Sequence, residues 1–362
     1  MHPATQLSAP PPIFIVGAPR SGTTMLAAML GSHSSYSVGP ESQFFSKLTP
    51  EALDRAKSDP AWPAVATDLL SGLTLVGQPV AGLFGLSRAD VEGYLASREP
   101  SIQAMLEALT VPFTEGKGKT GWAEKTPNHL LNLPKIRSLW PEARIVRIMR
   151  DPRDAAISSC QLDAFSDSFA ANIYMWRAWQ DAARDFVASD ANSYTIRYET
   201  LVEHPEAELR SLCGFLDIPY EEGMLDFSRA AEAVSSPAET WKGPVSKGLT
   251  RDRIFAWKKV LGAEMKRLAN DVTYEYLCEF DYEREAPSEN TRSVFRMSPQ
   301  FVERHERFLV RLSTKNVRWL PSAEPSQADI VAEQPEYYRS RNPGFLARIA
   351  LTRIRMMLGR IG

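Results

Sequence analysis

Residues 13–30 read Ile13-Phe-Ile-Val-Gly-Ala-Pro-Arg-Ser-Gly-Thr-Thr-Met-Leu-Ala-Ala-Met-Leu30. The four apolar residues at its start predict a short buried strand, and the apolar stripe at its end predicts an amphipathic helix. Between them, Gly17 and Gly22 are separated by four residues, which is the spacing of a phosphate-binding loop between a strand and a helix. The stretch therefore predicts a loop that binds a phosphate-like anion.

The loop differs from that of nucleoside-triphosphate P-loops, which place a lysine directly after the second glycine. Thr23 stands at that position, and Arg20 supplies the cation inside the loop. Backbone N–H groups of a tight turn form an anion-binding nest, to which the next helix adds its positive end. Arg20 suits two anionic oxygens at once, and Ser21, Thr23 and Thr24 add hydroxyl donors. The alternative is a plain helix N-terminus, capped by these hydroxyls.

Length and composition indicate a soluble globular protein. Its 362 residues allow one large α/β domain or two ordinary ones, and 44% apolar residues supply a core. A formal net charge of −2 argues against nucleic-acid binding. Three widely spaced cysteines argue against a zinc site or a disulfide framework and fit a cytoplasmic compartment. We see neither a secretory signal in the Pro-rich residues 1–12 nor a membrane-spanning apolar run.

Strand and helix patterns alternate along the chain. We expect further strands at 120–127, 143–150 and 194–198, and helices at 134–140, from 151 through 159, at 168–189, from 200 onward and at 251–280. Residues 228–250 are expected to form a loop. The alternation predicts an α/β fold of the P-loop type, with a parallel sheet covered by helices on both faces. In such sheets ligands bind beyond the carboxyl ends of the strands.

The chain is expected to have three parts: a flexible arm at 1–12, a main domain at 13–283 and an extension at 284–362. Within the domain, residues 42–118 predict an irregular insertion over the sheet edge, which either shapes a binding pocket or only packs on the surface. The extension ends in a candidate basic amphipathic helix at 345–361. That helix either docks on the domain or a partner, or makes peripheral contact with an anionic membrane surface.

A second anion site is indicated by Arg150-Asp-Pro-Arg-Asp-Ala-Ala-Ile-Ser158. Arg150 closes a predicted strand and Ser158 lies two turns into the next helix, so a guanidinium and a hydroxyl can converge on one phosphate. The alternative pairs Arg150 with Asp151 or Asp154 and leaves Ser158 in solvent. Two phosphate sites at two strand ends suit a nucleotide that is phosphorylated at both ends of its ribose.

Three segments taken together, GAPRSGTT, RIMRDPRDAAISS and IRYETLVEHPEAELRSLCGFLDIP, resemble the sulfotransferases that use 3′-phosphoadenosine-5′-phosphosulfate (PAPS). The resemblance covers roughly residues 13–280 and is closest to the bacterial carbohydrate-type and tyrosylprotein-sulfotransferase-like branch. It implies that the 5′-phosphosulfate is held by Arg20, Ser21, Gly22, Thr23 and Thr24. It also implies that the 3′-phosphate is held by Arg150 and Ser158, and that the adenine contacts Tyr198.

The same resemblance implies a late basic loop that closes over the 3′-phosphate or the base. Lys247 and Gly248 are the candidates, although their spacing to Trp257 differs from that of relatives, and Lys242-Gly243 compete with them.

For the chemistry, Glu41 matches the family's general base, and Lys125 matches a lysine near the bridging oxygen. Lys125 and Arg20 would stabilise charge on the transferring group. His129 is an alternative base, and a salt bridge to a loop cation such as Arg20 is the alternative role of Glu41.

The resemblance thus implies in-line transfer of a sulfuryl group from PAPS, without a metal, to a hydroxyl or amine of an acceptor. The acceptor class stays open among carbohydrate, lipid, peptide and small metabolite. One alternative is a P-loop kinase or NTPase, in which Asp151 would bind Mg²⁺. Another is a non-catalytic nucleotide-binding protein.

Overall fold

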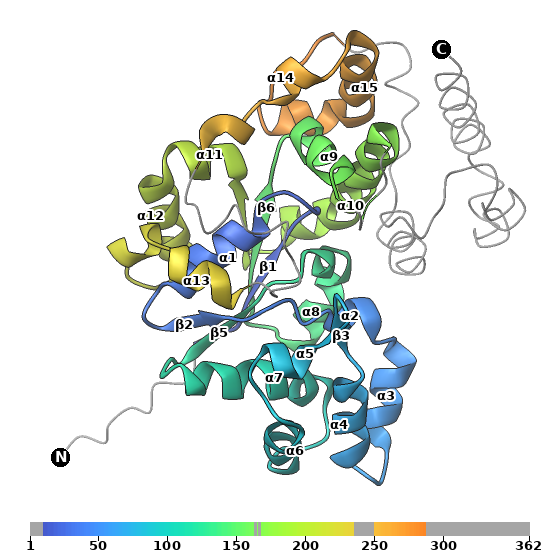
Figure 1. Ribbon diagram of the computed structural model, residues 1–362, viewed down its shortest axis with the longest axis vertical. Helices are drawn as coiled ribbons and strands as arrows, with labels where there is room; N and C mark the ends of the chain where they lie inside the picture. Colours follow the sequence, from blue (N-terminus) through green and yellow to red (C-terminus); the bar gives the residue numbers. More distant parts are fainter. Residues whose placement is uncertain (1–9, 163–164, 166–167, 235–249, 287–362) are drawn as a thin grey trace, which may run out of the picture. The chain divides into compact units, whose positions relative to one another are not determined.

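The computed structural model describes residues 10–162, 165, 168–234 and 250–286 (Figure 1). The chain divides into two compact units, one of residues 1–150 with 183–252 and the other of residues 151–182 with 253–362. Lys247, Gly248 and the candidate helix at 345–361 lie outside the described residues. The three-part division expected from the sequence, including the arm at 1–12, therefore stays a prediction.

A parallel five-stranded sheet forms the centre of the larger unit, within the described part of the chain. Its strand order is β2-β5-β1-β6-β7, with bounds Tyr36–Val38, Gly121–Glu124, Ile13–Val16, Arg144–Met149 and Ser193–Arg197. All four residues of β1 are buried, as expected for a central strand of a parallel sheet. The predicted strands and the parallel sheet are confirmed.

Helices cover both faces of this sheet. The connection from β1 to β2 crosses the sheet in one direction, and the connection from β2 to β5 crosses it in the other. Because connections between parallel strands are right-handed, the helices of these two connections lie on opposite faces of the sheet. Helix α1 (Thr23–Gly31) lies on one face, where α13 (Ser228–Ala233) and η2 (Glu222–Leu225) pack against it. Helix α7 (Ile102–Gly116) packs on β5 and β2 from the other face. The predicted α/β class is confirmed.

The larger unit also contains helical segments between and after the later strands. They are η1 (Pro127–Asn132), α8 (Leu133–Leu139), α11 (Tyr198–Glu203) and α12 (Pro205–Leu216). The predicted helix after residue 200 is split in two, because His204 precedes a proline and leaves the helical conformation.

Two sequence expectations are wrong. Helix α1 is not amphipathic but buried along its whole length from Thr23 to Leu30, since α13 and η2 cover the side that faces away from the sheet. The predicted loop at 228–250 begins with helix α13, whose sequence Ser-Arg-Ala-Ala-Glu-Ala consists mostly of good helix formers. Residues 235–249 lie outside the described part of the chain.

The insertion at 42–118 is more regular than its composition suggests. It contains helices α2 (Phe44–Lys47), α3 (Pro50–Ser58), α4 (Ala64–Ser71), α5 (Val80–Leu83), α6 (Arg88–Ala96) and α7, with a hairpin of β3 (Thr74–Leu75) and β4 (Gln78–Pro79). The side chains of Thr49, Ser87 and Ser101 cap α3, α6 and α7. These caps set the helix starts in a segment rich in Gly and Pro.

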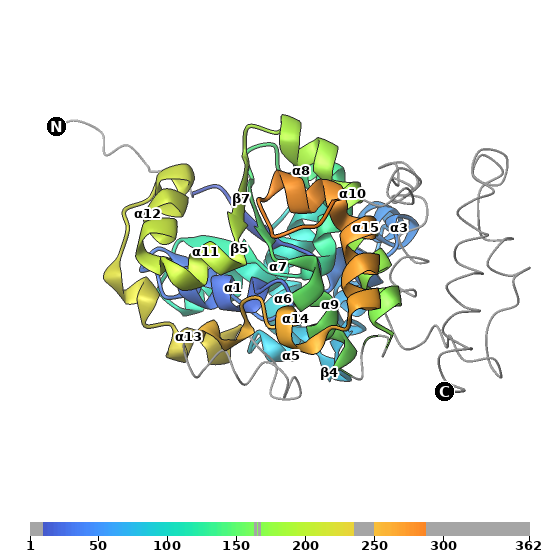
Figure 2. The same cartoon turned by 90° about the horizontal axis from the view of Figure 1, so that it is seen from above.

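The smaller unit is helical in its described part. Figure 2 shows α14 (Trp257–Val260) and α15 (Ala263–Glu279) beside α9 (Pro152–Cys160). The long helix α10 (Phe169–Ser189) begins in this unit, and η4 (Arg251–Arg253) lies at its boundary. Ala156, Ile173, Ala269 and Val272 form its buried cluster. The helices predicted from 151 through 159 and at 168–189 are confirmed, whereas the helix predicted at 251–280 is divided into η4, α14 and α15. Among the residues that the structure describes, none of the helices has the length and apolarity to cross a membrane.

Candidate active site

The carboxyl ends of three neighbouring strands carry the residues that the sequence singled out for chemistry. Strands β2, β5 and β1 are adjacent in the sheet and parallel. β2 leads to Glu41, β5 leads directly to Lys125, and β1 leads into the loop that starts at Gly17. The fold therefore brings segments about 100 residues apart in sequence to one edge of the sheet.

The loop after β1 has the backbone of an anion-binding turn. Arg20 and Gly22 have positive φ angles of 67° and 98°, and the N–H of Ser21 donates to the Ala18 carbonyl at 3.2 Å. A backbone in which positive and negative φ angles alternate turns successive N–H groups toward one side of the chain. The Ser21 hydroxyl is buried and has no hydrogen-bond partner in the described part of the protein. A buried hydroxyl of this kind is suited to a ligand oxygen.

Helix α1 begins at the end of this loop and adds its N-terminus to it. Gly22 is the N-cap residue, and its carbonyl accepts from the N–H of Leu26 at 3.1 Å. No side chain of the described residues caps the helix there. The N–H groups of the first turn, with buried Thr23 and Thr24, are thus oriented as anion donors.

Arg150 and Tyr198 pack onto the loop from the ends of β6 and β7. A Cβ placed on Gly22 would lie 2.5 Å from Cδ2 of Tyr198, so the tyrosine ring lies directly on the glycine. The Arg150 guanidinium stands 4.6 Å from the centre of that ring, and its Nη1 donates to the Arg20 carbonyl at 2.9 Å. Arg150, whose guanidinium is predicted to bind one phosphate, is therefore hydrogen-bonded to the loop that is predicted to bind another.

Glu41 and Lys125 form a buried ion pair. The Lys125 Nζ donates to Oε1 of Glu41 at 2.8 Å, and the Gln43 amide donates to Oε2 at 2.8 Å. Lys125 is completely buried and Glu41 nearly so. Lys125 is thus an ion-pair partner of the Glu41 carboxylate, and a salt bridge between Glu41 and Arg20 stays a prediction from the sequence.

Glu124 is a functional residue that sequence reasoning missed. Its buried carboxylate accepts hydrogen bonds from both the N–H and the hydroxyl of Ser42, at 3.3 and 2.7 Å, and from both the N–H and the hydroxyl of Thr126, at 3.1 and 2.6 Å. Ser42 follows Glu41, and Thr126 follows Lys125. Glu124 thus orients both members of the ion pair through their neighbours.

His129 completes this network instead of facing the site. Its Nδ1 lies 2.6 Å from Oε2 of Glu124, and its Nε2 accepts from the Phe45 N–H at 3.3 Å. The ring is completely buried. Because both ring nitrogens have protein partners, His129 is a positioning residue for Glu124, and the arrangement favours Glu41 as the base.

The pKa of Glu124 reflects this environment. Burial raises the pKa of its carboxyl, and the His129 imidazole with the hydroxyls of Thr126 and Ser42 lowers it by more. The net pKa lies below its ordinary value of 4.5, so the carboxylate is ionised at neutral pH.

In the smaller unit, the Asp-Pro-Arg-Asp motif forms a second cluster around Trp257. Asp151 accepts from the Arg153 guanidinium at 2.8 and 2.7 Å and from the Trp257 indole N–H at 3.1 Å. The Trp257 backbone N–H donates to Asp154 at 2.8 Å, and the Arg153 guanidinium stacks 3.7 Å from the Trp257 ring centre. These contacts occupy Asp151 with a guanidinium and an indole, which disfavours it as a Mg²⁺ ligand.

The roles of the remaining candidates stay predictions from the sequence. Ser158 belongs to α9 of the smaller unit, so its shared role with Arg150 stays a prediction. Lys247 and Gly248 lie outside the described residues. Within the described ranges, no three His, Cys, Asp or Glu side chains are grouped closely enough to hold a metal ion.

Known proteins resemble the chain in both sequence and fold. Residues 11–222 match the sequence model described as "Sulfotransferase family". Protein-tyrosine sulfotransferase A of Caenorhabditis elegans is 25% identical over 256 residues, which are 68% of this chain and 61% of that protein. Protein-tyrosine sulfotransferase 1 of Danio rerio is 24% identical over 267 residues, or 71% and 68% of the two chains.

Among solved structures, the sulfotransferase domain from the curacin biosynthetic pathway matches 76% of this chain and 99% of its own length, with a TM-score of 0.53 and 21% identity. That likeness concerns the fold. The chain spans about three fifths of the length of the C. elegans relative.

We expect Gly22→Ala to destabilise the loop more than its backbone angle alone requires. Gly77, in the β3–β4 hairpin, also has a positive φ, but a Cβ there would meet nothing within 4 Å. Gly77→Ala should therefore lower the free energy of unfolding by about 1–2 kcal/mol. Gly22→Ala should lower the free energy of unfolding by about 1 kcal/mol or more beyond that loss, because its Cβ would clash with the Tyr198 ring. Urea unfolding of both variants measures the difference, and equal losses would contradict the packing of Tyr198 on Gly22.

We also expect Glu124 to contribute stability that depends on pH. Because its folded pKa is lowered, the contribution is present above pH 4.5 and is lost as the pH falls through the folded pKa. Glu124→Gln should cost about 3 kcal/mol at pH 7 by disrupting a buried charge network. Below pH 4.5 the stability difference between wild type and variant should shrink.

Urea unfolding at several pH values tests this, with exposed Glu99→Gln as the control, which should stay within about 0.5 kcal/mol of wild type. If the free energies of unfolding of wild type and Glu124→Gln differ by the same amount from pH 7 to pH 3, Glu124 is not the titrating group.

Proposed function

The chain belongs to the sulfotransferase family, and from that premise we propose that it transfers a sulfuryl group from PAPS to a hydroxyl or amine of an acceptor. The observation that carries the proposal is the Glu41–Lys125 pair at 2.8 Å. Glu41 follows β2 and Lys125 follows β5, and β5 lies between β2 and β1, the strand that leads into the anion-binding loop. A carboxylate base, a buried cation and an anion nest at one sheet edge are the groups that this transfer needs.

The residues of the loop fit the donor's anionic end. The buried hydroxyl of Ser21, the first-turn N–H groups after Gly22 and the guanidinium of Arg20 would hold the 5′-phosphosulfate. Arg150 would hold the 3′-phosphate, and Tyr198 would contact the adenine. When bound, PAPS supplies the sulfuryl group and leaves as adenosine 3′,5′-bisphosphate (PAP).

Glu41 would act on the acceptor and Lys125 on the leaving group. The Glu41 carboxylate accepts the proton of the acceptor hydroxyl while that oxygen forms its bond to sulfur in line with the breaking bond. Lys125 and Arg20 stabilise the negative charge that remains on the phosphate oxygen when the sulfur–oxygen bond breaks. Gln43 and Lys125 orient the Glu41 carboxylate through its two oxygens. No metal is assigned a role in this scheme.

A P-loop kinase is disfavoured by two observations. Thr23 stands where such enzymes place the phosphate-binding lysine. Asp151, the candidate Mg²⁺ ligand, is instead bound by Arg153 and Trp257.

Acceptor, location and membrane contact stay predictions from the sequence. The relatives named above are protein-tyrosine sulfotransferases, but the chain spans only part of the C. elegans relative, so their acceptor is not carried over. The sequence also predicts a cytoplasmic location and contact of residues 345–361 with a membrane or partner.

Donor specificity can be measured without an acceptor. We expect PAP to raise the melting temperature and ATP with Mg²⁺ to leave it unchanged, since a ligand at 100 times its Kd stabilises by about 2.7 kcal/mol. Arg20→Ala and Arg150→Ala should each weaken PAP binding about tenfold or more, because each removes a charged hydrogen-bond donor. Arg210→Ala, which removes an exposed arginine, is the control and should bind PAP as wild type does. Stabilisation by ATP with Mg²⁺ but not by PAP would favour the kinase.

The base is tested by Glu41→Gln. Transfer of label from ³⁵S-PAPS is measured with 2-naphthol, methyl glucoside and a tyrosine-containing peptide as probe acceptors. With any probe that wild type sulfates, the variant should be slower by about 10²–10⁴-fold, and PAP should bind within about threefold of wild type. Glu99→Gln serves as the matched exposed control. A variant that transfers as fast as wild type would overturn the assignment of Glu41 as base.

A further inference from the structure

Gln43 is the half-buried residue beside the proposed base. Its side-chain nitrogen Nε2 donates to Oε2 of Glu41 at 2.8 Å, whereas Lys125 donates to the other oxygen, Oε1. The Lys125 side chain is fully buried, and the Glu41 side chain keeps 10% of its surface exposed. Of these two donors to the carboxylate, Gln43 is therefore the one that a ligand can also contact.

The chemistry of this contact fixes which way the Gln43 amide faces. A carboxylate paired with an ammonium has only acceptor oxygens, so the amide must turn its nitrogen toward Glu41 and its carbonyl oxygen away from it. In the part of the chain that the structure describes, no group donates to that carbonyl. The carbonyl of the Gln43 side chain is thus available to a hydrogen-bond donor on an acceptor molecule.

The backbone holds Gln43 in one place. Its φ angle is 54°, which is uncommon for a residue with a side chain. Its N–H donates to the Thr126 hydroxyl at 3.2 Å, and its backbone carbonyl accepts from the N–H of Lys47 at 2.9 Å. The Thr126 hydroxyl in turn donates to Glu124 at 2.6 Å. Such a conformation persists where surrounding contacts enforce it, so the Glu124 network fixes Gln43 as well as Glu41.

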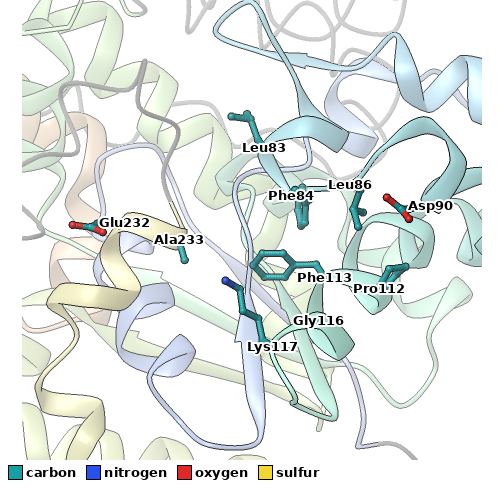
Figure 3. Close-up of a pocket in the computed structure, with 11 residues that line it drawn as sticks. Leu83, Phe84, Leu86, Asp90, Pro112, Phe113, Gly116, Lys117, Glu232 and Ala233 are labelled. Carbon is teal, nitrogen blue, oxygen red and sulfur yellow. The ribbon is translucent and has the colours of Figure 1, made fainter.

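The segment that leads to Gln43 also packs on the helical insertion. A Cβ at Gly39 would lie 2.2 Å from Cε1 of Phe84, so the Phe84 ring rests on the Gly39 backbone. Figure 3 shows Phe84 at a pocket of about 630 Å³ between the segment after α5, the end of α7 and the end of α13. Neither Glu41 nor Gln43 is among the described residues that line this pocket, so we assign it no part in binding the acceptor.

Glu41 and Gln43 together present two hydrogen-bond acceptors to a ligand. The nitrogen and oxygen of an amide share one carbon atom, so the Gln43 carbonyl lies close to the nitrogen that contacts Oε2 of Glu41. A hydroxyl carries a single hydrogen, which the reacting hydroxyl gives to Glu41. The Gln43 carbonyl therefore requires a second hydrogen from a neighbouring group of the same molecule. Two hydroxyls on adjacent carbon atoms meet this requirement.

Resting on the proposed function, we propose that Gln43 is a specificity-determining residue and that the acceptor is a vicinal diol. One hydroxyl gives its proton to Oε2 of Glu41 as its oxygen forms the bond to sulfur. The electrons of the breaking sulfur–oxygen bond stay on the phosphate oxygen of the departing PAP. The neighbouring hydroxyl keeps its proton and donates a hydrogen bond to the Gln43 carbonyl. An acceptor with an isolated hydroxyl lacks that second contact.

Matched pairs of probe acceptors test this inference on the full chain. Each pair is a diol and its monomethyl ether: catechol with 2-methoxyphenol, and cis-1,2-cyclohexanediol with cis-2-methoxycyclohexanol. Transfer of label from ³⁵S-PAPS gives kcat/KM for each probe. We expect wild type to favour the diol of at least one pair about tenfold or more, because the ether cannot donate to Gln43.

Two variants remove the carbonyl of Gln43. Gln43→Met keeps the length of the side chain and should lower the preference for the diol to about twofold, which the two hydroxyls of a diol give by number alone. A merely structural role would slow diol and ether alike and leave their ratio unchanged. Gln43→Lys retains a donor for Glu41 and should lose the same preference, which keeps the test decisive if Gln43→Met does not fold.

Gln103→Met is the matched control, because Gln103 is also half-buried and its amide donates to the Leu139 carbonyl at 3.0 Å. It should keep the wild-type preference for the diol.

Three results would overturn the inference. Wild type transfers label to neither diol, it favours the diols by no more than about twofold, or both Gln43 variants retain its preference. PAP binding to wild type and to each variant is measured in parallel by calorimetry. If wild type binds PAP and gives one of these results, the role of Gln43 fails and the proposed donor stands. If wild type does not bind PAP, the proposed function itself fails.

Discussion

The hydrogen bonds to the buried Glu124 carboxylate are the interaction on which the candidate site depends. They join Ser42, after β2, to Thr126 and His129, after β5. A buried charge is tolerated only when its partners surround it, so these two segments have one stable arrangement. That arrangement brings the neighbouring Glu41 and Lys125 within 2.8 Å of each other. The stability of the fold and the geometry of the Glu41–Lys125 pair thus depend on the same atoms.

The loop after β1 is held in place by close packing of side chains as well as by hydrogen bonds. Tyr198 rests on Gly22, and Arg150 stacks on Tyr198 while donating to the Arg20 carbonyl. A side chain larger than hydrogen at Gly22 would displace this stack. The guanidinium of Arg150 is therefore oriented by the loop, which couples the two predicted phosphate contacts within one unit.

The end of β2 packs against the helical insertion at 42–118. The Phe84 ring packs on the backbone of Gly39, and Glu41 follows Gly39 after one proline. Because the Phe84 ring packs on this short segment, a substitution that moves Phe84 is expected to move Glu41 as well. The helical insertion at 42–118 thus supports the segment that carries Glu41 and also covers the sheet edge.

By itself, the sequence determined the parallel sheet, the loop at 17–24 and the candidate Arg150, because apolar runs, glycine spacing and strand-end positions are local patterns. The candidates Glu41, Lys125 and Tyr198 came from the resemblance to the sulfotransferases. The roles of Glu124 and His129, the Asp151–Trp257 contact and the burial of α1 on all sides came only from tertiary structure. Ser42 and Glu124 are 82 residues apart, and Asp151 and Trp257 are 106 apart. A glutamate in Ala-Glu-Lys-Thr-Pro carries no local sign of burial. Its environment is created only when the ends of distant strands meet at one edge of the sheet, since burial and hydrogen-bond partners depend on the whole packed arrangement.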